Sequence, residues 1–341
     1  MSGALSGKRV LFIAPRFFGY EREIERELRA RGAEVDVLPD RPFDSPVMKA
    51  VTRFSRTSMI RTADAFYRCE IGRLARPSFD LVFVINGQTL SKAVLRELRE
   101  AHPRARFVLY VWDSFENRSS ILENIPFFDD CQSFDPQGCK LHGIKLRPLF
   151  FSRGFERVPD ASFTYHFSFI GTAHTDRYSV VSKLKASLGA GYKSYVYFYL
   201  QAHWVYCFQR VFNRDFSGAK REYFHFEPLS RKEVQNVFFS SRAVVDIEHL
   251  RQTGLTIRTL ETLGASRKLI TTNAGIRDYD FYNAENICII DRDKPVVPPG
   301  FLESPYRPIP QEVYARYSIA GWLDEVLGLA NSTGAVAPSP Q

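Results

Sequence analysis

The sequence predicts an α/β protein with two Rossmann-like domains facing a cleft and a closing C-terminal helix. The chain has 341 residues, more than a single hydrophobic core usually serves. A strand, a helix and a second strand open it at residues 9–38, and the same order starts again at residue 165. We expect an N-terminal domain over 1–155, a second domain over 160–310, a closing helix over 311–330 and a flexible tail over 331–341.

The composition is that of an ordinary folded protein, with 45% hydrophobic and 25% charged residues. The five cysteines are scattered and form no CxxC pair, which favours a reducing compartment and argues against a structural zinc site or a disulfide framework. No apolar stretch is long enough for a signal peptide or a membrane span. We therefore expect a cytoplasmic protein.

The net charge of +8 is compatible with nucleic acid, an anionic membrane surface or phosphorylated small molecules. Nucleic-acid binding is supported by this charge alone, because no helix-turn-helix, zinc-finger or RNA-recognition signature is present. Residues 49–76 combine many basic side chains with apolar residues at near-helical spacing. They predict a basic amphipathic helix, which either lies on an anionic membrane or covers a domain with its basic face in solvent. Its basic residues are Lys49, Arg53, Arg56, Arg61, Arg68, Arg73 and Arg76.

Apolar runs predict the strands of the first domain. Residues 9–14 form a strand that leads to a helix over 21–31, and residues 33–38, 80–86 and 106–112 form further strands. The opening lacks the GxGxxG pattern, which argues against a tightly bound dinucleotide.

Polar residues stand at two of these strand ends. Asn86 and Gln88 follow one strand, and Asp113 and Ser114 follow the next. Because the carboxyl ends of parallel strands line the cleft of an open α/β sheet, these side chains would face it together. Asp113 is our candidate general base for an acceptor hydroxyl, a role worth on the order of 100-fold to 10,000-fold in rate. Alternatively, Asp113 or Ser114 is the N-cap of the following helix.

The second domain begins with the strand 165–172, which ends in Gly171 and Thr172. A glycine at this point lets backbone approach a ligand closely. His174 and Arg177 lie just beyond, where a diphosphate would need compensation of its charge. His174 is equally compatible with a loop histidine that contacts no ligand.

Three further segments carry helix predictions. Residues 201–213 are rich in aromatic side chains, and such stripes usually belong to a core. Ser230 and Glu233 have the spacing of a capping box, which predicts the start of a helix. Residues 312–329 predict a closing amphipathic helix.

The stretch 246–273 predicts a strand, a short loop, a helix and a second strand. Thr253 and Gly254 stand where the N-cap and helix entry belong, so the unpaired N–H groups beside Gly254 would face an anion. Arg258 and Glu261 are three residues apart and share one face of the helix. Arg258 can reach a phosphate and Glu261 can accept hydrogen bonds from a ribose, although the two also fit an ordinary surface pair.

The residues GLTIRTLETLGASRKLITTN, from Gly254 onward, resemble the donor-nucleotide segment of GT-B glycosyltransferases. The branch is similar to the CgeB-like proteins of spore-coat, capsule and lipopolysaccharide synthesis. In retaining members two glutamates bracket this helix entry; Glu261 matches the second, whereas Thr253 stands at the first. This departure, with Asp113 as a base, favours inversion. The resemblance implies a donor site at Gly171, Thr172, His174, Arg177, Gln252, Gly254, Arg258 and Glu261, with Asn86, Gln88 and Ser114 on the acceptor side.

The resemblance implies a glycosyltransferase that moves a sugar from a nucleotide-sugar donor to a polysaccharide or lipid-linked glycan. It also implies that the final helix, over 311–330, crosses back to the N-terminal domain. Such an enzyme would be cytoplasmic, and peripheral at the inner face of the membrane if residues 49–76 touch it. Asp278 and Asp280 have DxD spacing, as do Asp291 and Asp293, but one such spacing is common by chance. We predict no required cofactor and no essential metal. The alternative is a non-catalytic protein that binds a nucleotide or phosphosugar within a membrane-associated glycan assembly complex.

Overall fold

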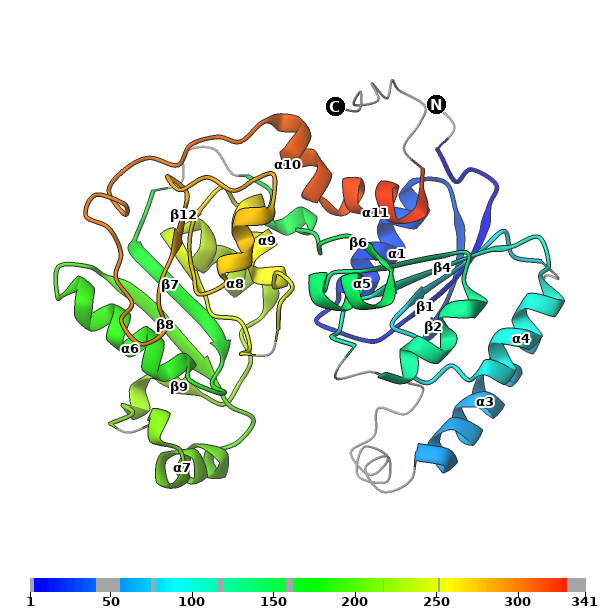
Figure 1. Cartoon of the computed structure of the whole chain (residues 1–341), viewed down its shortest axis with the longest axis horizontal. Helices are drawn as coiled ribbons and strands as arrows, with labels where there is room; N and C mark the ends of the chain where they lie inside the picture. Colours follow the sequence, from blue (N-terminus) through cyan, green and yellow to red (C-terminus); the bar gives the residue numbers. More distant parts are fainter. Residues whose placement is uncertain are drawn as a thin grey trace. The chain divides into compact units, whose positions relative to one another are not determined.

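The structure, a computed structural model, describes residues 3–40, 56–74, 78–115, 119–157, 162–216, 218–250 and 252–329 (Figure 1). The chain divides into two compact units, each with its own parallel sheet. Unit 1 comprises Met1–Pro148 and Ile319–Gln341, and unit 2 comprises Leu149–Ser318. The predicted pair of α/β domains, with a C-terminal helix returning to the first, is confirmed.

Two predictions fall wholly or partly outside the described residues. The predicted flexible tail over 331–341 lies outside them. So do residues 41–55 and 75–77, which include Lys49, Arg53 and Arg76 of the predicted basic helix.

The described strands of unit 1 form a parallel sheet in the order β2-β1-β3-β4-β5-β6. β1 pairs with β2 on one side and β3 on the other, so that Val10 lies opposite both Val35 and Leu81. The chain thus changes direction across the sheet between β1 and β3, which creates a topological switch point at their carboxyl ends. The strands are β1 (Arg9–Ala14), β2 (Glu34–Pro39), β3 (Leu81–Ile85), β4 (Arg106–Val111), β5 (Asp130–Ser133) and β6 (Lys145–Leu146).

Helices flank this sheet (Figure 1). Ser91 is the N-cap of α4, and its hydroxyl accepts a hydrogen bond from the Val94 backbone N–H. Val94, Leu95 and Leu98 on the same helix are buried against the strands. The helices of unit 1 are α1 (Tyr20–Ala30), α3 (Arg56–Arg73), α4 (Lys92–Ala101), α5 (Pro136–His142) and α11 (Ile319–Leu327), with a 3-10 helix over Ser119–Phe127.

The described part of the predicted basic helix is α3. Ala63 and Tyr67 are fully buried in the core of unit 1. Arg68 donates two hydrogen bonds to the Glu97 carboxylate and pairs with it at 2.7 Å. These side chains fit the interpretation of a helix that covers a domain with its basic face in solvent, and membrane contact through residues 49–76 stays a prediction.

The chain returns to unit 1 through α11. Trp322 is completely buried, with its ring 4.8 Å from that of Tyr110 in an edge-to-face arrangement. Polar contacts fix the helix on both sides, since Arg31 pairs with Asp324 at 2.9 Å and Arg147 pairs with Glu325 at 2.9 Å. Residues near the C-terminal end of the chain therefore complete the core of unit 1.

Unit 2 repeats the doubly wound plan, with the described strands in the order β12-β11-β10-β7-β8-β9. β7 pairs with β8 on one side and β10 on the other, so a second switch point lies at the carboxyl ends of β7 and β10. The strands are β7 (Tyr165–Thr172), β8 (Ser194–Tyr199), β9 (Phe224–His225), β10 (Ser241–Asp246), β11 (Lys268–Thr271) and β12 (Ile287–Ile289).

The helices of unit 2 correct two predictions and confirm one. Ser230 and Glu233 form the predicted capping box of α8. The single helix predicted over 312–329 is two helices, because Ser318 is extended and bridges to Phe151. The aromatic stripe of α7 points largely to solvent and not into a core. The helices are α6 (Arg177–Leu188), α7 (His203–Phe212), α8 (Arg231–Phe239), α9 (Ile257–Gly264) and α10 (Gln311–Tyr317), with short 3-10 turns at Arg153–Phe155, Arg214–Phe216, Arg221–Tyr223 and Ala274–Asp278.

Among the described residues, no helix is both long and apolar enough to cross a membrane.

The packing of α11 predicts that Trp322→Ala destabilises unit 1. Removing a fully buried tryptophan leaves a cavity between α11 and the sheet, which costs about 3–5 kcal/mol in the free energy of unfolding. Denaturant titration followed by circular dichroism measures the change. Leu141→Ala, on an exposed site of the same unit, is the control and should change the value by less than about 0.5 kcal/mol. Equal stability of Trp322→Ala and the wild type would contradict the role given to α11.

Candidate functional site

The switch point of unit 2 gathers the predicted donor residues. Thr172 ends β7 and Asp246 ends the neighbouring β10, and the segments that follow both strands leave the same edge of the sheet. His174 and Arg177 follow β7, whereas Gln252, Gly254 and Arg258 follow β10. In an open α/β sheet this is the edge at which ligands bind.

Arg177 joins the two strand ends. Its Nε donates to the Ile247 carbonyl at 2.8 Å, and its Nη1 donates to the Thr172 carbonyl at 3.3 Å. Burial lowers the pKa of the guanidinium, while the nearby Asp246 carboxylate opposes that shift. Two of its five N–H donors are thus used to hold backbone. Arg177 is part of the framework of the site as well as a predicted ligand for the diphosphate.

The entry to α9 differs from the prediction. The N-cap is Thr256 and not Thr253, and its hydroxyl accepts from the Thr259 backbone N–H at 3.2 Å. The Asp246 carboxylate accepts from the hydroxyls of Thr256 and Thr259, at 2.6 and 2.7 Å. A negative side chain therefore already stands at the positive end of this helix. The expected anion site on N–H groups beside Gly254 is not at the helix start, which comes two residues later.

Arg258 and Glu261 do not form an ordinary surface pair. Glu261 is only 2% exposed, although it stands one turn into the helix. Arg258 is half-buried, with its guanidinium carbon 5.6 Å from the Phe238 ring centroid. Its Nη1 is buried and has no hydrogen-bond acceptor among the residues that the structure describes. Such an orphaned donor is costly unless a water or a ligand accepts from it.

Gly171, Gly254 and Gln252 shape the segments that follow the two strands. A Cβ on Gly171 would lie 2.9 Å from the Phe169 ring and 3.5 Å from Nη1 of Arg177. The space beside Gly171 is thus occupied by these two side chains. Gln252 donates from Nε2 to the Gly254 carbonyl at 3.0 Å, which closes the loop on itself.

His174 is neutral at physiological pH. Burial lowers its pKa from 6.5 to about 4, and the positive charge of Arg177 acts in the same direction. Its ring lies 5.6 Å from that of His249, and its Nδ1 is 3.3 Å from the Thr175 hydroxyl. In this state His174 offers one donor and one acceptor and no charge.

An ion-pair network beside the site was not predicted from the sequence. Arg292 donates from Nη1 to both oxygens of Asp176 at 2.9 Å, and from Nη2 to Glu248 Oε1 at 2.6 Å. The other Glu248 oxygen accepts from the Thr272 hydroxyl. Glu248 stands two residues past β10. The rule that polar residues at the carboxyl ends of parallel strands are site candidates, which we call the strand-end rule and which selected Asp113, therefore also selects Glu248.

In unit 1 the predicted acceptor residues also meet at strand ends. Asn86 is buried with φ of 63°, and its side-chain oxygen accepts from the Trp112 backbone N–H at 3.0 Å, which ties β3 to β4. Asn86 thus has a structural task. Asp113 and Ser114 are half-buried, and Asp113 Oδ1 accepts from the Ser114 N–H at 3.0 Å. Gln88 is half-buried on the same loop as Asn86.

Aromatic side chains at this edge were missed in the sequence. Phe17 and Phe18 follow β1 and are exposed, and Phe18 has a left-handed backbone with φ of 51°. The Phe17 ring lies 6.0 Å from that of Trp112, the residue next to Asp113. A sugar ring can pack its apolar face on such a surface.

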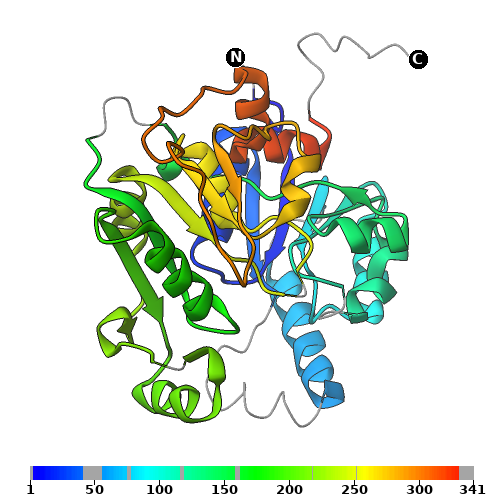
Figure 2. The same cartoon turned by 60° about the vertical axis from the view of Figure 1, so that its left-hand side comes forward.

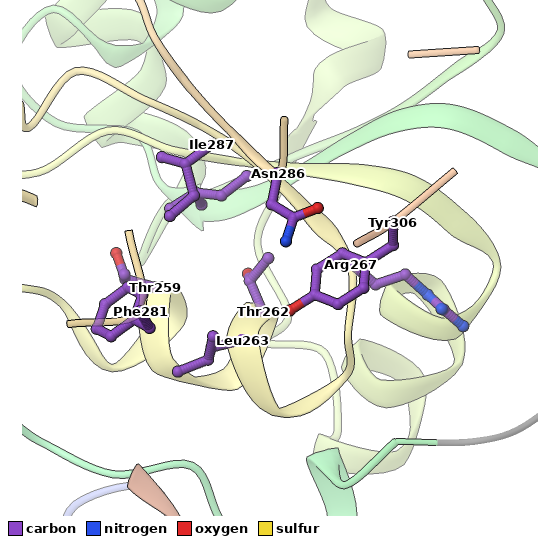
Figure 3. A pocket seen from close by; sticks show the side chains of 9 residues that line it. Thr259, Thr262, Leu263, Arg267, Phe281, Asn286, Ile287 and Tyr306 are labelled. Carbon is purple, nitrogen blue, oxygen red and sulfur yellow. The ribbon is translucent and has the colours of Figure 1, made fainter. Parts of the chain in front are cut away.

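A small recess lies elsewhere in unit 2, beneath α9 (Figure 3). Figure 3 shows Asn286 and Ile287 across it from Thr259, Thr262 and Leu263. About 10 Å³ of it is open to the centre of a water molecule, room for about one water. A nucleotide does not fit there.

No protein-family model matches this chain, and no curated protein matches it either. Among solved structures, it is similar to Anabaena Alr3699/HepE in complex with UDP and glucose, with a TM-score of 0.51 at 10% identity over 94% of this chain and 99% of that one. A glycosyltransferase from Rickettsia africae ESF-5 gives a TM-score of 0.49 at 12% identity, over 94% of this chain and 88% of that one. The similarity to the Anabaena protein shows a shared fold of two α/β domains, which is the fold that the GT-B resemblance implies.

The residues with known placement hold no group of three or more His, Cys, Asp or Glu side chains arranged for a metal ion. Metal independence stays a prediction.

The lowered pKa of His174 predicts how stability depends on pH. The unfolded chain takes up a proton near pH 6.5 and the folded chain near pH 4, so the stability that neutral His174 contributes is complete above pH 6.5 and is lost as the pH falls toward 4. His174→Asn removes this loss. Between pH 7 and pH 4.5 we expect the free energy of unfolding of the wild type to fall by about 1–2 kcal/mol more than that of the variant, after allowance for partial exposure. Parallel curves for the two proteins would contradict the burial of a neutral His174.

Proposed function

We propose that the chain is a glycosyltransferase that takes a sugar from a nucleotide-sugar donor bound at the switch point of unit 2. The observation that carries the proposal is the buried Arg258 nitrogen, which lacks an acceptor among the described residues, close enough to Arg177 to influence its pKa. Two guanidinium groups at the carboxyl edge of a doubly wound sheet suit a diphosphate. The shared fold with a protein solved with UDP and glucose adds support for a uridine diphosphate donor.

The proposed reaction needs stabilisation of the leaving nucleoside diphosphate. Negative charge develops on the diphosphate as the bond between its oxygen and the anomeric carbon breaks. Arg177 and Arg258 are positioned to compensate this charge without a metal ion. The Asp246 carboxylate does not share this task, because it is itself negative; two threonine hydroxyls hold it at the start of α9. Glu261 and Gln252 are proposed to contact the nucleoside.

The acceptor is proposed to bind at the carboxyl edge of the unit 1 sheet. An acceptor hydroxyl attacks the anomeric carbon, and Asp113 takes its proton, so the sugar is transferred with inversion. Phe17, Phe18 and Trp112 offer an apolar surface to a sugar ring of the acceptor. The acceptor class we propose is a polysaccharide or a lipid-linked glycan of capsule or lipopolysaccharide type, used by a cytoplasmic enzyme at the inner face of a membrane.

Titration with UDP tests the donor site. Arg258→Met removes a charged donor whose guanidinium nitrogen has no described protein acceptor, so it should weaken UDP binding by about 10-fold to 100-fold with little change in stability. Arg177→Met should weaken binding and also destabilise unit 2 by about 2–4 kcal/mol, because two carbonyls lose their donors. Calorimetry and denaturant titration measure the two effects.

Lys232→Met, which removes one exposed charge from α8, is the matched control and should bind UDP like the wild type. If Arg258→Met also binds UDP like the wild type, the diphosphate is not held at this site.

Asp113→Asn tests the chemistry. Asp113 is not the N-cap expected as the alternative, because the next described helical segment begins at Ser119. An asparagine Oδ1 can still accept from the Ser114 backbone N–H, so the variant keeps that hydrogen bond while losing the base. We expect transfer from a UDP-sugar to fall by about 100-fold to 10,000-fold, with UDP affinity and unfolding unchanged. Glu100→Gln, which removes an exposed carboxylate from α4 of the same unit, should retain most activity. If the wild type binds UDP but releases none from a panel of UDP-sugars, the chain is the alternative, a non-catalytic nucleotide-binding protein.

A further inference from the structure

We propose that α7 of unit 2 is an interfacial helix that seats the protein on an anionic phospholipid surface. This deepens the proposed function and rests on it for its purpose, because a lipid-linked acceptor lies in such a surface. The site differs from the predicted membrane contact at residues 49–76, where Ala63 and Tyr67 pack in unit 1 and Arg68 pairs with Glu97.

The outer face of α7 is apolar. Trp204 is 71% exposed, Phe208 53%, Val211 73% and Phe212 73%. At 100° per residue these four side chains fall within an arc of about 100°. Single exposed apolar residues are normal on protein surfaces, but a continuous face of large ones marks an interaction site. We call these four residues the α7 face.

The inner face of the helix explains why α7 is stable without covering its outer side. Tyr206 is buried, donates from its hydroxyl to the Ala219 carbonyl at 3.1 Å, and packs its ring 4.9 Å from that of Phe224. Val205 packs against the same core. The helix is therefore anchored to unit 2 by one side and presents the α7 face away from it. Figures 1 and 2 both show α7 at the lower end of unit 2.

Charge favours a membrane as the occupant of this face. Residues 203–223 contain four basic side chains and two acidic ones, and none of the acidic ones lies on α7 itself. Arg210 is exposed on α7. Arg221 lies next to the helix, with its guanidinium carbon 5.9 Å from the centroid of the Tyr206 ring. A helix with tryptophan and phenylalanine on one side and basic residues at its flanks is typical of proteins that lie in the interface of an anionic bilayer.

The position of α7 links this surface to the donor site. Tyr199, the last residue of β8, lies opposite Thr172, the last residue of β7. α7 begins four residues after Tyr199, so it leaves the same edge of the sheet as the segment that holds His174 and Arg177. A bilayer that covers the α7 face thus lies at the edge of unit 2 where the sugar donor is proposed to bind.

Vesicle binding tests the proposal. The wild type should sediment with vesicles of phosphatidylcholine and phosphatidylglycerol, less with phosphatidylcholine alone, and less at high salt. The double variant with Phe208→Ser and Phe212→Ser should partition at least about tenfold more weakly, because it removes two aromatic rings from the bilayer contact. The matched control combines Leu141→Ser and Val296→Ser, which are 75% and 64% exposed on other surfaces, and should bind like the wild type.

Tryptophan fluorescence reports the geometry independently. The sequence has three tryptophans, of which Trp322 is fully buried and Trp112 half-buried, so Trp204 is the exposed one. Its emission should shift to the blue on addition of anionic vesicles. Trp204→Phe should abolish the shift and keep the protein on the vesicles.

Three outcomes overturn the proposal. In the first, the wild type stays in the supernatant when anionic vesicles are sedimented. In the second, the double variant binds these vesicles as well as the wild type does. In the third, neither protein binds vesicles, and the wild type forms a dimer that the double variant does not form. The last outcome assigns the α7 face to a second copy of the chain. UDP calorimetry keeps the test of the membrane contact separate from the test of the donor site. If the wild type binds UDP but not vesicles, only the membrane contact is refuted; if it binds vesicles but not UDP, only the donor site is refuted. The double variant should bind UDP like the wild type.

Discussion

The guanidinium of Arg177 holds the switch point of unit 2 together. β7 and β10 are neighbours, but the chain leaves them in different directions, and the carbonyls of Thr172 and Ile247 are left at the diverging ends. Arg177 donates to both, at 3.3 and 2.8 Å. Burial disfavours its charge, and the bonds to carbonyls together with the nearby Asp246 carboxylate offset that cost. Gly171 lies beside this guanidinium, and a Cβ there would come within 2.9 Å of the Phe169 ring and 3.5 Å of Nη1 of Arg177.

The charges around this crevice separate into groups with different tasks. Arg292 is neutralised by Asp176 and Glu248, and the Asp246 carboxylate is held by two hydroxyls. What remains is the buried nitrogen of Arg258, for which the described residues supply no acceptor. Within the described residues, the arrangement thus leaves a buried nitrogen of Arg258 without an acceptor, near a second arginine that holds two backbone carbonyls. A phosphate group has the charge and the acceptor geometry that this position lacks.

The sequence predicted the sheets well because their strands are short apolar runs buried on both faces, as at residues 165–172 and 268–271. The strand-end rule located the candidate residues, since it depends only on topology. Local choices were harder to predict. Thr253 and Thr256 are equally good N-caps by type, and the contact of Thr256 with Asp246, ten residues away, accompanies the observed helix start. The break at Ser318 likewise depends on its bridge to Phe151, which is distant in the sequence.

Composition alone does not tell whether an aromatic helix is inside or outside, as α7 and α11 illustrate. Both carry a tryptophan and several large apolar residues. α11 returns to a broad sheet, where Tyr110 and Phe83 surround Trp322 and remove it from water. α7 stands next to β9, a strand of two residues at the end of its sheet, which is too short to cover more than one side of the helix. Apolar side chains of α11 gain roughly 25 cal/mol of burial free energy for each Å² of surface removed from water. The exposed apolar side chains of α7 do not gain this free energy. A contact outside this chain recovers that free energy, which is the physical reason to expect a partner surface at α7.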